Sequence, residues 1–368
     1  MFPFKQIRIG FINTERIGHL ALNLELFCRK QQSGYSKDWT HIFLAGNPCN
    51  QQLLTMWKRH LHIFQIPVLW ELLWPVQWLW KTSRFFEPLE MLSNEYEDFQ
   101  TGHPTLFFTE TEKEKGKNFL LSQGIDLGKH WYVCVFARDE AYLNVNYPGA
   151  DWGYHHFRNA DIDQFIPAIE YIINRGGFVI RMGHHVGKPL KFRHPQVIDY
   201  ALSARNDFAD IYLMAHCRFV LGTTSGICDI AMIFDVPRIG TNFVPIGHMP
   251  HGKHCLYLPK LLFQKEMNQP VPFKWILSET RKREHPWNFD GETITKAGYE
   301  YVENKPEDIL AITQEMMDRL EGIWKPSMED QELLLHYFNL FPQDHWSKMV
   351  KTPIGLEFLK KYREFFIS

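Results

Sequence analysis

Small hydroxyl residues and a glycine stand between a short apolar run and a helical pattern in the second half of the chain. Residues 218–222 predict a buried strand, and residues 226–234 predict a helix that starts soon after it. A helix N-terminus presents free N–H groups and partial positive charge, and small residues let a phosphate approach the backbone. We predict that Thr224, Ser225 and Gly226 bind a phosphate. An ordinary capped helix start is the alternative, and both interpretations stay open.

Two arginines accompany other apolar runs. Arg138 directly follows one run, and Arg181 lies inside another. Ligands of parallel sheets bind outside the carboxyl ends of the strands, and the planar guanidinium fork suits a diphosphate. We predict that both arginines bind the diphosphate and stabilise it as it leaves, which makes them candidate catalytic residues. A salt bridge to Asp139 or Asp199 is the alternative.

Further polar residues are expected at the same edge. His156 and Arg158 lie in a loop before a predicted helix, Gly183 ends the strand that holds Arg181, and Asn242 follows a short predicted strand. We therefore add His156, Arg158, Gly183 and Asn242 to the predicted phosphate-binding set.

The sequence indicates neither a metal site nor a cofactor, and it argues against several classes of enzyme. The 18 histidines form no HExxH motif or zinc-type ligand set, and residues 161–163, although of DxD form, are better placed to cap a helix. GxSxG, P-loop and GxGxxG motifs do not occur. We therefore predict no metal site and no cofactor, and serine hydrolases, P-loop kinases and standard dinucleotide oxidoreductases are not first choices.

The elements that must position these residues alternate between strand and helix. Strands are predicted at 7–12, 41–45, 131–137, 178–182 and 218–222, and helices at 163–174, 210–216, 226–234 and 306–320. Such alternation with short connections predicts an α/β fold with a parallel, doubly wound sheet. The 368 residues suggest two domains, which we place at 1–128 and 129–330, followed by C-terminal helices at 331–368 that cross back to the first domain.

Charge and cysteine usage bear on partners and compartment. Forty basic and 42 acidic side chains give a net charge of −2, which argues against a nucleic-acid partner. Six scattered cysteines, with no secretory signal and no long apolar span, favour a cytoplasmic protein.

Residues 63–84 are unusually rich in tryptophan. Trp70, Trp74 and Trp78 recur every four residues among leucines, and Lys58 and Lys81 flank the segment. Tryptophan and flanking cations are typical of segments at a membrane interface, so we predict a possible peripheral contact with the inner face of a membrane. The alternative is that these rings form the core of the first domain or an oligomer interface.

The combined pattern resembles a bacterial glycosyltransferase family of surface-polysaccharide biosynthesis. The resemblance covers most of residues 7–320 and is carried by ERIGHLALNLELF, VFARDEAY, HFRNADIDQFIPAIEYIINRGGFVIRMG, VIDYA, LGTTSGICDIAMIFDVPRIGTN and YVENKPEDI. It implies a GT-B fold, in which two Rossmann-like domains face a cleft. The first domain would bind the acceptor and the second a nucleotide sugar.

The resemblance also implies a function and a second set of residues. It implies transfer of a sugar from a nucleotide-sugar donor to a glycan or a lipid-linked acceptor. A catalytic base would come from the first domain, where Glu15 and His19 follow the first predicted strand. For His19, packing at the start of a helix is the alternative. Two other functions stay open: a nucleotide-sugar epimerase or hydrolase on the same scaffold, and a non-catalytic carbohydrate-binding subunit.

Overall fold

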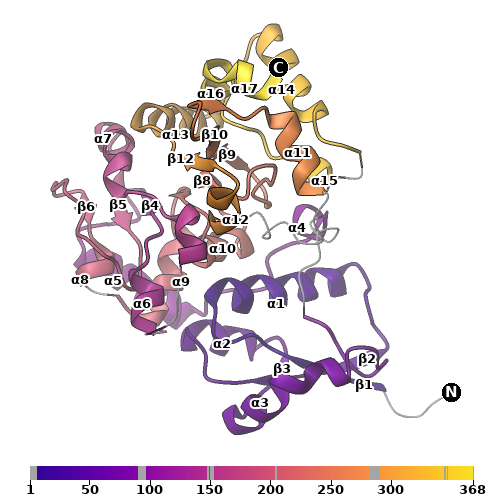
Figure 1. Ribbon diagram of the computed structural model, residues 1–368. Coiled ribbons are helices and arrows are strands. Elements are labelled where there is room, and N and C mark those ends of the chain that lie inside the picture. Colours follow the sequence, from indigo (N-terminus) through magenta and orange to yellow (C-terminus); the bar gives the residue numbers. More distant parts are fainter. Residues whose placement is uncertain are drawn as a thin grey trace.

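Two parallel sheets with flanking helices make up most of the computed structural model (Figure 1). The structure describes residues 6–89, 97–146, 149, 153–203, 205–281, 291–343, 345 and 347–367.

The first sheet has three parallel strands in the order β1-β2-β3. Its elements alternate along the chain: β1 (Gln6–Phe11), α1 (Ile17–Gln32), β2 (Trp39–Ala45), α2 (Gln51–Trp57) and β3 (His62–Gln65). Next come α3 (Pro67–Leu73) and the 3-10 helix η1 (Trp74–Leu79), after which Phe86 forms a parallel bridge to Ile9 on the free side of β1. Because β1 therefore has neighbours on both sides, the strand order reverses there, which makes its carboxyl end a switch point.

The second sheet has six parallel strands in the order β6-β5-β4-β7-β8-β9. They are β4 (Tyr132–Phe136), β5 (Phe178–Arg181), β6 (Val197–Ile198), β7 (Val220–Gly222), β8 (Arg238–Phe243) and β9 (Cys255–Pro259). Numbered from β4, this is the 3-2-1-4-5-6 order of a Rossmann sheet, and its switch point lies between β4 and β7.

The helices of this part belong mostly to the crossovers between its strands. They are α4 (Glu97–Thr101), α5 (Glu110–Ser122), α6 (Ala141–Asn146), η2 (Gly153–Arg158), η3 (Ile162–Phe165), α7 (Ile166–Asn174), α8 (Tyr200–Ser203), α9 (Asp207–His216) and α10 (Gly226–Ile233). Pro167 stands in the first turn of α7, where its missing N–H costs nothing.

A small antiparallel sheet and a group of helices follow the second sheet. The sheet has the order β11-β10-β12, with β10 (Leu261–Gln264), β11 (Gln269–Pro270) and β12 (Tyr299–Val302). The helices are α11 (Phe273–Arg281), α12 (Gly291–Lys296), α13 (Pro306–Leu320), α14 (Met328–Asn339), α15 (Ser347–Val350), α16 (Leu356–Lys361) and α17 (Arg363–Ile367). The strands from β9 onward were not predicted, because His, Pro and Lys between the short apolar runs obscure them.

Helices α1 and α10 join the two sheets into one packed body. A cluster of buried apolar side chains runs without a break from α1 and α2 through α9 and α10. At the point of closest approach the helix N-termini touch: a Cβ on Gly226 would lie 2.6 Å from the backbone nitrogen of Gly18. The loops at the two switch points therefore meet.

Three sets of contacts bear on the predicted division into domains. Helix α5 lies within the predicted first domain, yet Gly116 packs against the ring of Tyr212 in α9. The C-terminal helices α16 and α17 pack on α13, α14 and α11, at the upper end of the molecule in Figure 1. One hydrogen bond, from Gln100 in α4 to the Val350 carbonyl, also ties the C-terminal stretch to the segment that links the two sheets. The boundaries at 128 and 330 stay predictions.

Candidate functional site

The predicted phosphate-binding residues gather at one edge of the second sheet. Arg181 ends β5, Arg138 follows β4, residues 223–226 follow β7 and Asn242 lies near the end of β8. These are neighbouring parallel strands, so the residues share the carboxyl edge. The Arg138 backbone N–H donates to Thr223 Oγ1 at 2.9 Å, which ties β4 to β7 at the switch point.

Asn159 links two cations along this edge. Arg138 Nη1 donates to Asn159 Oδ1 at 2.6 Å, and Lys260 Nζ donates to the Asn159 carbonyl at 2.7 Å. Arg138 and Lys260 are both buried. Their positive charges are therefore held at fixed positions on either side of Asn159.

Lys260 was not predicted as a site residue. It follows β9 directly, and that strand went unrecognised in the sequence. Burial lowers the pKa of its ammonium group to about 8, although Glu303 opposes this shift. A bound anion would favour the charged form and raise this pKa again. If β9 had been recognised in the sequence, the position of Lys260 at the end of a strand would have made it a candidate site residue.

Arg158 lies beside the same edge in a strongly positive environment. Its Nη2 donates to the Thr224 carbonyl at 3.1 Å. Loss of hydration lowers the pKa of its guanidinium to about 9, and the charges of Arg138 and Arg16 add to this effect, while Asp229 opposes it. Several cations crowded together in this way make the site favourable for an anion such as a diphosphate.

The Ser225 hydroxyl makes no capping hydrogen bond at the start of α10, although Ser225 occupies the N-cap position. Thr224 Oγ1 lies 3.4 Å from both the carbonyl and the N–H of Val244. The capped-helix alternative therefore does not account for the Ser225 hydroxyl, and a phosphate contact through Ser225 and Gly226 stays a prediction.

Arg181 forms the salt bridge that was weighed as its alternative role. Its Nη1 lies 3.1 Å from Asp199 Oδ2, and the arginine side chain is almost fully buried. Gly183, which follows, has a φ of +154°, and a Cβ there would lie 2.7 Å from Val186 Cγ1. The structure thus explains both residues without a ligand, and their donor roles stay predictions.

Asn242 and His156 also have protein partners. Asn242 Oδ1 accepts from the Asn304 N–H at 2.8 Å, and its own N–H donates to Asn304 Oδ1 at 2.5 Å. This reciprocal pair fixes Asn242 at a φ of +48°. The exposed His156 ring lies 3.2 Å from Glu140 Oε1. Asn304 was not among the predicted residues, since no sequence pattern links it to Asn242.

The predicted base residues lie where α1 meets this edge. Glu15 and His19 both have exposed surface; Glu15 precedes α1 and His19 lies in its first turn. The pKa of His19 lies below its ordinary value, because neighbouring atoms reduce its hydration and Arg16 is close. A neutral imidazole at pH 7 can accept a proton, as a general base must.

A buried ion pair supports the junction and was also missed. Asp229 Oδ1 lies 3.1 Å from Arg238 Nη1, and a Cβ on Gly18 would lie 2.8 Å from Asp229 Oδ2. Burial raises the pKa of Asp229 to about 6, against the opposing effects of Arg238 and Arg158. The Asp229 carboxyl group thus stands between the positive edge of the second sheet and the start of α1.

The DxD segment caps a helix, as expected. Asp161 Oδ1 accepts from the Asp163 N–H at 2.9 Å at the start of η3, and Lys188 pairs with both carboxylates. Within the described ranges, no group of three or more His, Cys, Asp or Glu side chains could hold a metal ion. Metal independence stays a prediction.

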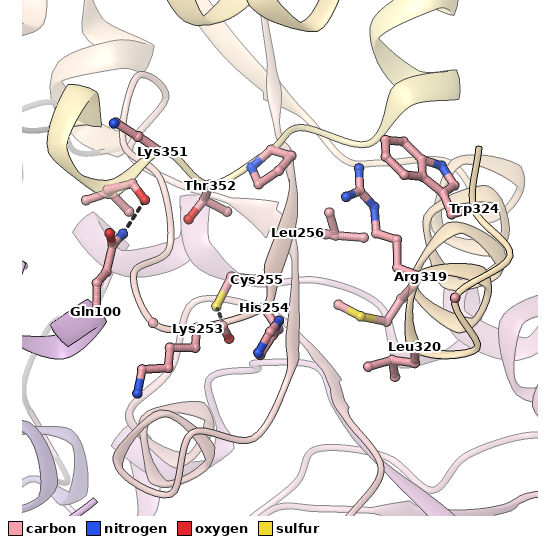
Figure 2. Close-up of a pocket in the computed structure, with 15 residues that line it drawn as sticks. Gln100, Lys253, His254, Cys255, Leu256, Arg319, Leu320, Trp324, Lys351 and Thr352 are labelled. Atoms are coloured by element: carbon pink, nitrogen blue, oxygen red, sulfur yellow. Dashed lines mark hydrogen bonds between the residues drawn. The ribbon is translucent and has the colours of Figure 1, made fainter. Parts of the chain in front are cut away.

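Figure 2 shows a separate pocket of about 670 Å³ at the amino end of β9, opposite the edge that carries Lys260. Two of its cations have partners: Arg319 stacks on Trp324 and pairs with Glu315, and Lys253 pairs with Asp235. None of the predicted site residues lines this pocket.

Comparisons with proteins of known structure identify the fold. No family model and no curated protein matches the sequence. A glycosyl transferase of family 9 from Veillonella parvula aligns over 86% of this chain and 99% of its own, with a TM-score of 0.50 at 9% identity. The E. coli ADP-heptose lipopolysaccharide heptosyltransferase II aligns over 69% of this chain and 91% of its own, with a TM-score of 0.43 at 14% identity. The chain has the α/β architecture of GT-B glycosyltransferases, with two Rossmann-like units.

Segment 63–84 has a part that packs into the protein and a part that is exposed, and its contact with a membrane stays a prediction. Trp70 is buried, its Nε1 donates to the Ile12 carbonyl at 2.8 Å, and its ring stacks on Trp74 with centroids 4.9 Å apart. Trp78 is exposed. The break at Pro75, where α3 gives way to η1, separates Trp78 from the other two rings. None of the helices in the described segments has the length and apolar character needed to cross a bilayer.

Proposed function

We propose that this protein is a glycosyltransferase that moves a sugar from a nucleotide-sugar donor to a glycan or lipid-linked acceptor in surface-polysaccharide synthesis. One observation carries the proposal: Arg138, Arg158 and Lys260 surround the switch point of a Rossmann sheet beside the N-terminus of α10. This is where such sheets bind nucleotides, and the charge there is the opposite of a diphosphate's.

The same cations would assist departure of the leaving group. When the bond between the sugar C1 and the diphosphate oxygen breaks, its electron pair stays with the diphosphate, whose negative charge grows. Cations fixed beforehand stabilise this charge more than they stabilise the intact donor, which lowers the barrier. In this proposal they supply the charge that a metal ion supplies in other transferases.

His19 is the preferred base in the proposed reaction. It would accept the proton of the acceptor hydroxyl as the oxygen of that group bonds to C1. Its lowered pKa keeps it neutral and able to accept a proton at pH 7. Its place at the start of α1, which touches α10 through Gly18 and Gly226, supports this role. Glu15, which precedes α1, is the second choice.

The proposal also places the protein in the cytoplasm, where nucleotide sugars are available, at the inner face of a membrane that carries the acceptor. The six cysteines are all free thiols, as expected in a reducing compartment.

The proposed function is tested by incubating the purified protein with a panel of nucleotide sugars, with and without glycan and lipid-linked acceptors. Acceptor-dependent release of nucleoside diphosphate together with a glycosylated product supports it. Isomerised donor, or cleavage that needs no acceptor, would instead identify an epimerase or hydrolase. Donor binding without turnover on any acceptor would favour a carbohydrate-binding subunit.

A further inference from the structure

One face of the first sheet is unusually open for a parallel sheet. Alternate residues of the strands point to opposite faces, and Phe43 and Ala45 pack into the core shared with α1 and α2. The opposite face carries Phe11 and Leu44, which belong to a small apolar cluster with Trp70 and Phe86. Parallel sheets are normally buried on both faces, so this second face is incompletely covered by the described elements.

Apolar side chains of the strands remain exposed beside that small cluster. Ile7 and Ile9 on β1 are 47% and 44% exposed, and Phe64 on β3 is 52% exposed. The strand register places Phe64 level with Leu44 and Phe11, so it belongs to the open face. Ile7 and Ile9 precede Phe11 by four and two residues and therefore point the same way.

Helix α3 and η1 extend this apolar surface outward. Helix α3 turns Trp70 inward and exposes Val68 and Leu72, which are one turn apart and 70% and 67% exposed. In η1 and directly after it, Trp78, Leu79 and Trp80 are also exposed. A helix on the surface of a soluble domain normally shows polar residues to water, so this surface is built to meet an apolar partner.

Cations outnumber acids around the apolar residues. Lys58, Lys81 and Arg84 are exposed, and the Arg84 guanidinium lies 4.7 Å from the centre of the Phe85 ring. Glu71 is the exposed carboxylate within the segment, and Glu87 is buried and paired with Arg8. A positive apolar surface with exposed tryptophans matches an anionic bilayer, where indole rings lie at the headgroups and cations meet lipid phosphates.

We propose that the open face of the first sheet, together with α3, η1 and residues 80–85, is a docking surface for an anionic lipid bilayer. Val68, Leu72, Trp78 and Leu79 enter the interface, and Lys81 and Arg84 contact the headgroups. This inference deepens the proposed function and rests on it for the lipid-linked acceptor. Membrane binding itself is measured without any turnover.

The test is flotation of the full chain with two kinds of vesicle: phosphatidylcholine alone, and phosphatidylcholine mixed with phosphatidylglycerol. We expect the protein to float with the anionic vesicles and to remain unbound with the neutral ones. Leu72→Ser/Trp78→Ser should weaken binding by about tenfold or more, since two apolar anchors are lost. Lys81→Glu/Arg84→Glu should abolish the preference for anionic lipid.

The matched control is Met328→Ser/Leu335→Ser, which removes two equally exposed apolar side chains from α14 near the opposite end of the molecule (Figure 1). It should bind vesicles like the wild type, and far-UV circular dichroism should show every variant folded.

A wild type that stays unbound, or a Leu72/Trp78 variant that binds fully, overturns the proposal. So does a wild-type dimer that ignores vesicles and that the same variant dissociates, because the face would then meet a second copy. Donor turnover without vesicles tests the proposed function separately.

Discussion

At the scale of single residues, the cations at the carboxyl edge should control donor chemistry. Arg138→Ala should raise the donor KM and lower kcat, with about a 100-fold loss in kcat/KM, because diphosphate charge grows during departure. Steady-state kinetics with the donor found in the panel would measure this. The control is Arg175→Ala, an exposed arginine paired with Glu321, which should leave kcat/KM unchanged. If Arg138→Ala also leaves it unchanged, the diphosphate role is wrong.

Lys260 should give donor binding a dependence on pH. Its pKa is lowered from 10.5 to about 8, so the free protein loses this positive charge as the pH rises through 8. The donor KM should therefore rise between about pH 7 and pH 9. Lys260→Met should have a high KM at all pH values and lose this step. A wild-type KM that is flat over the same range would contradict the assignment.

Residue types alone could not show which of the two predicted arginines forms the salt bridge that was weighed as an alternative. Arg138 directly follows an apolar run and Arg181 lies inside one, yet Arg181 pairs with Asp199 whereas Arg138 donates to Asn159. Asp199 is 18 positions away along the chain, and its place is set by the crossover from β5 to β6. The positions at strand ends were predictable, whereas the partners, which come from distant parts of the chain, were not.

At the scale of elements, the contact between α1 and α10 requires two glycines. Gly226→Ala would place a methyl group 2.6 Å from the Gly18 nitrogen, so the helices must separate. We expect the free energy of unfolding to fall by about 1–3 kcal/mol, and turnover to fall with it. Thermal and urea unfolding would measure the change. Gly187→Ala is the control, since its Cβ would meet nothing closer than 3.6 Å.

Elements whose apolar residues recur with a clear helical or strand period could be predicted, whereas elements without such a pattern could not. The helix predicted from the first turn at Pro306 to about residue 320 is α13 (Pro306–Leu320), because its early proline marks the start. The strand at 255–259 was missed since CLYLP is short and follows a run of His, Pro and Lys. Its pairing with β8, rather than its own sequence, makes it part of the sheet. Here pairing with a neighbouring strand, and not local sequence preference, determines that the segment is a strand.

At the scale of the whole molecule, a buried arginine ties the first helix to distant segments. Arg29 in α1 lies 2.7 Å from Glu25 Oε1 and 3.0 Å from Asp235 Oδ1, and donates to the Phe99 carbonyl at 2.7 Å. Arg29→Met would leave the buried Glu25 carboxyl group, and the partly buried Asp235, without this partner. We expect a loss of about 3–5 kcal/mol in the free energy of unfolding. Calorimetry should show one transition for the wild type, since one apolar cluster spans both sheets; two well-separated transitions would contradict this.

Glu25 should make the stability of this assembly depend on pH. Burial raises its pKa from 4.5 to about 7 despite Arg29, so the folded state holds this proton more tightly than the unfolded state. Its contribution to stability is full below pH 4.5 and is lost as the pH rises through 7. Glu25→Gln should therefore flatten part of the decline in unfolding free energy between pH 5 and 7. Glu110→Gln, at an exposed position, should not.

The packing of α1 on α10 also has a consequence for synthesis on the ribosome. The side of α1 that meets α10 cannot be covered until the chain has been made past Ile233. At about 5–20 residues per second, the roughly 200 residues in between take about 10–40 s to translate. During that time an apolar helix surface at the head of the nascent chain has no native partner. Production of this protein should therefore depend on chaperones that bind early in translation, and on their supply in the host cell.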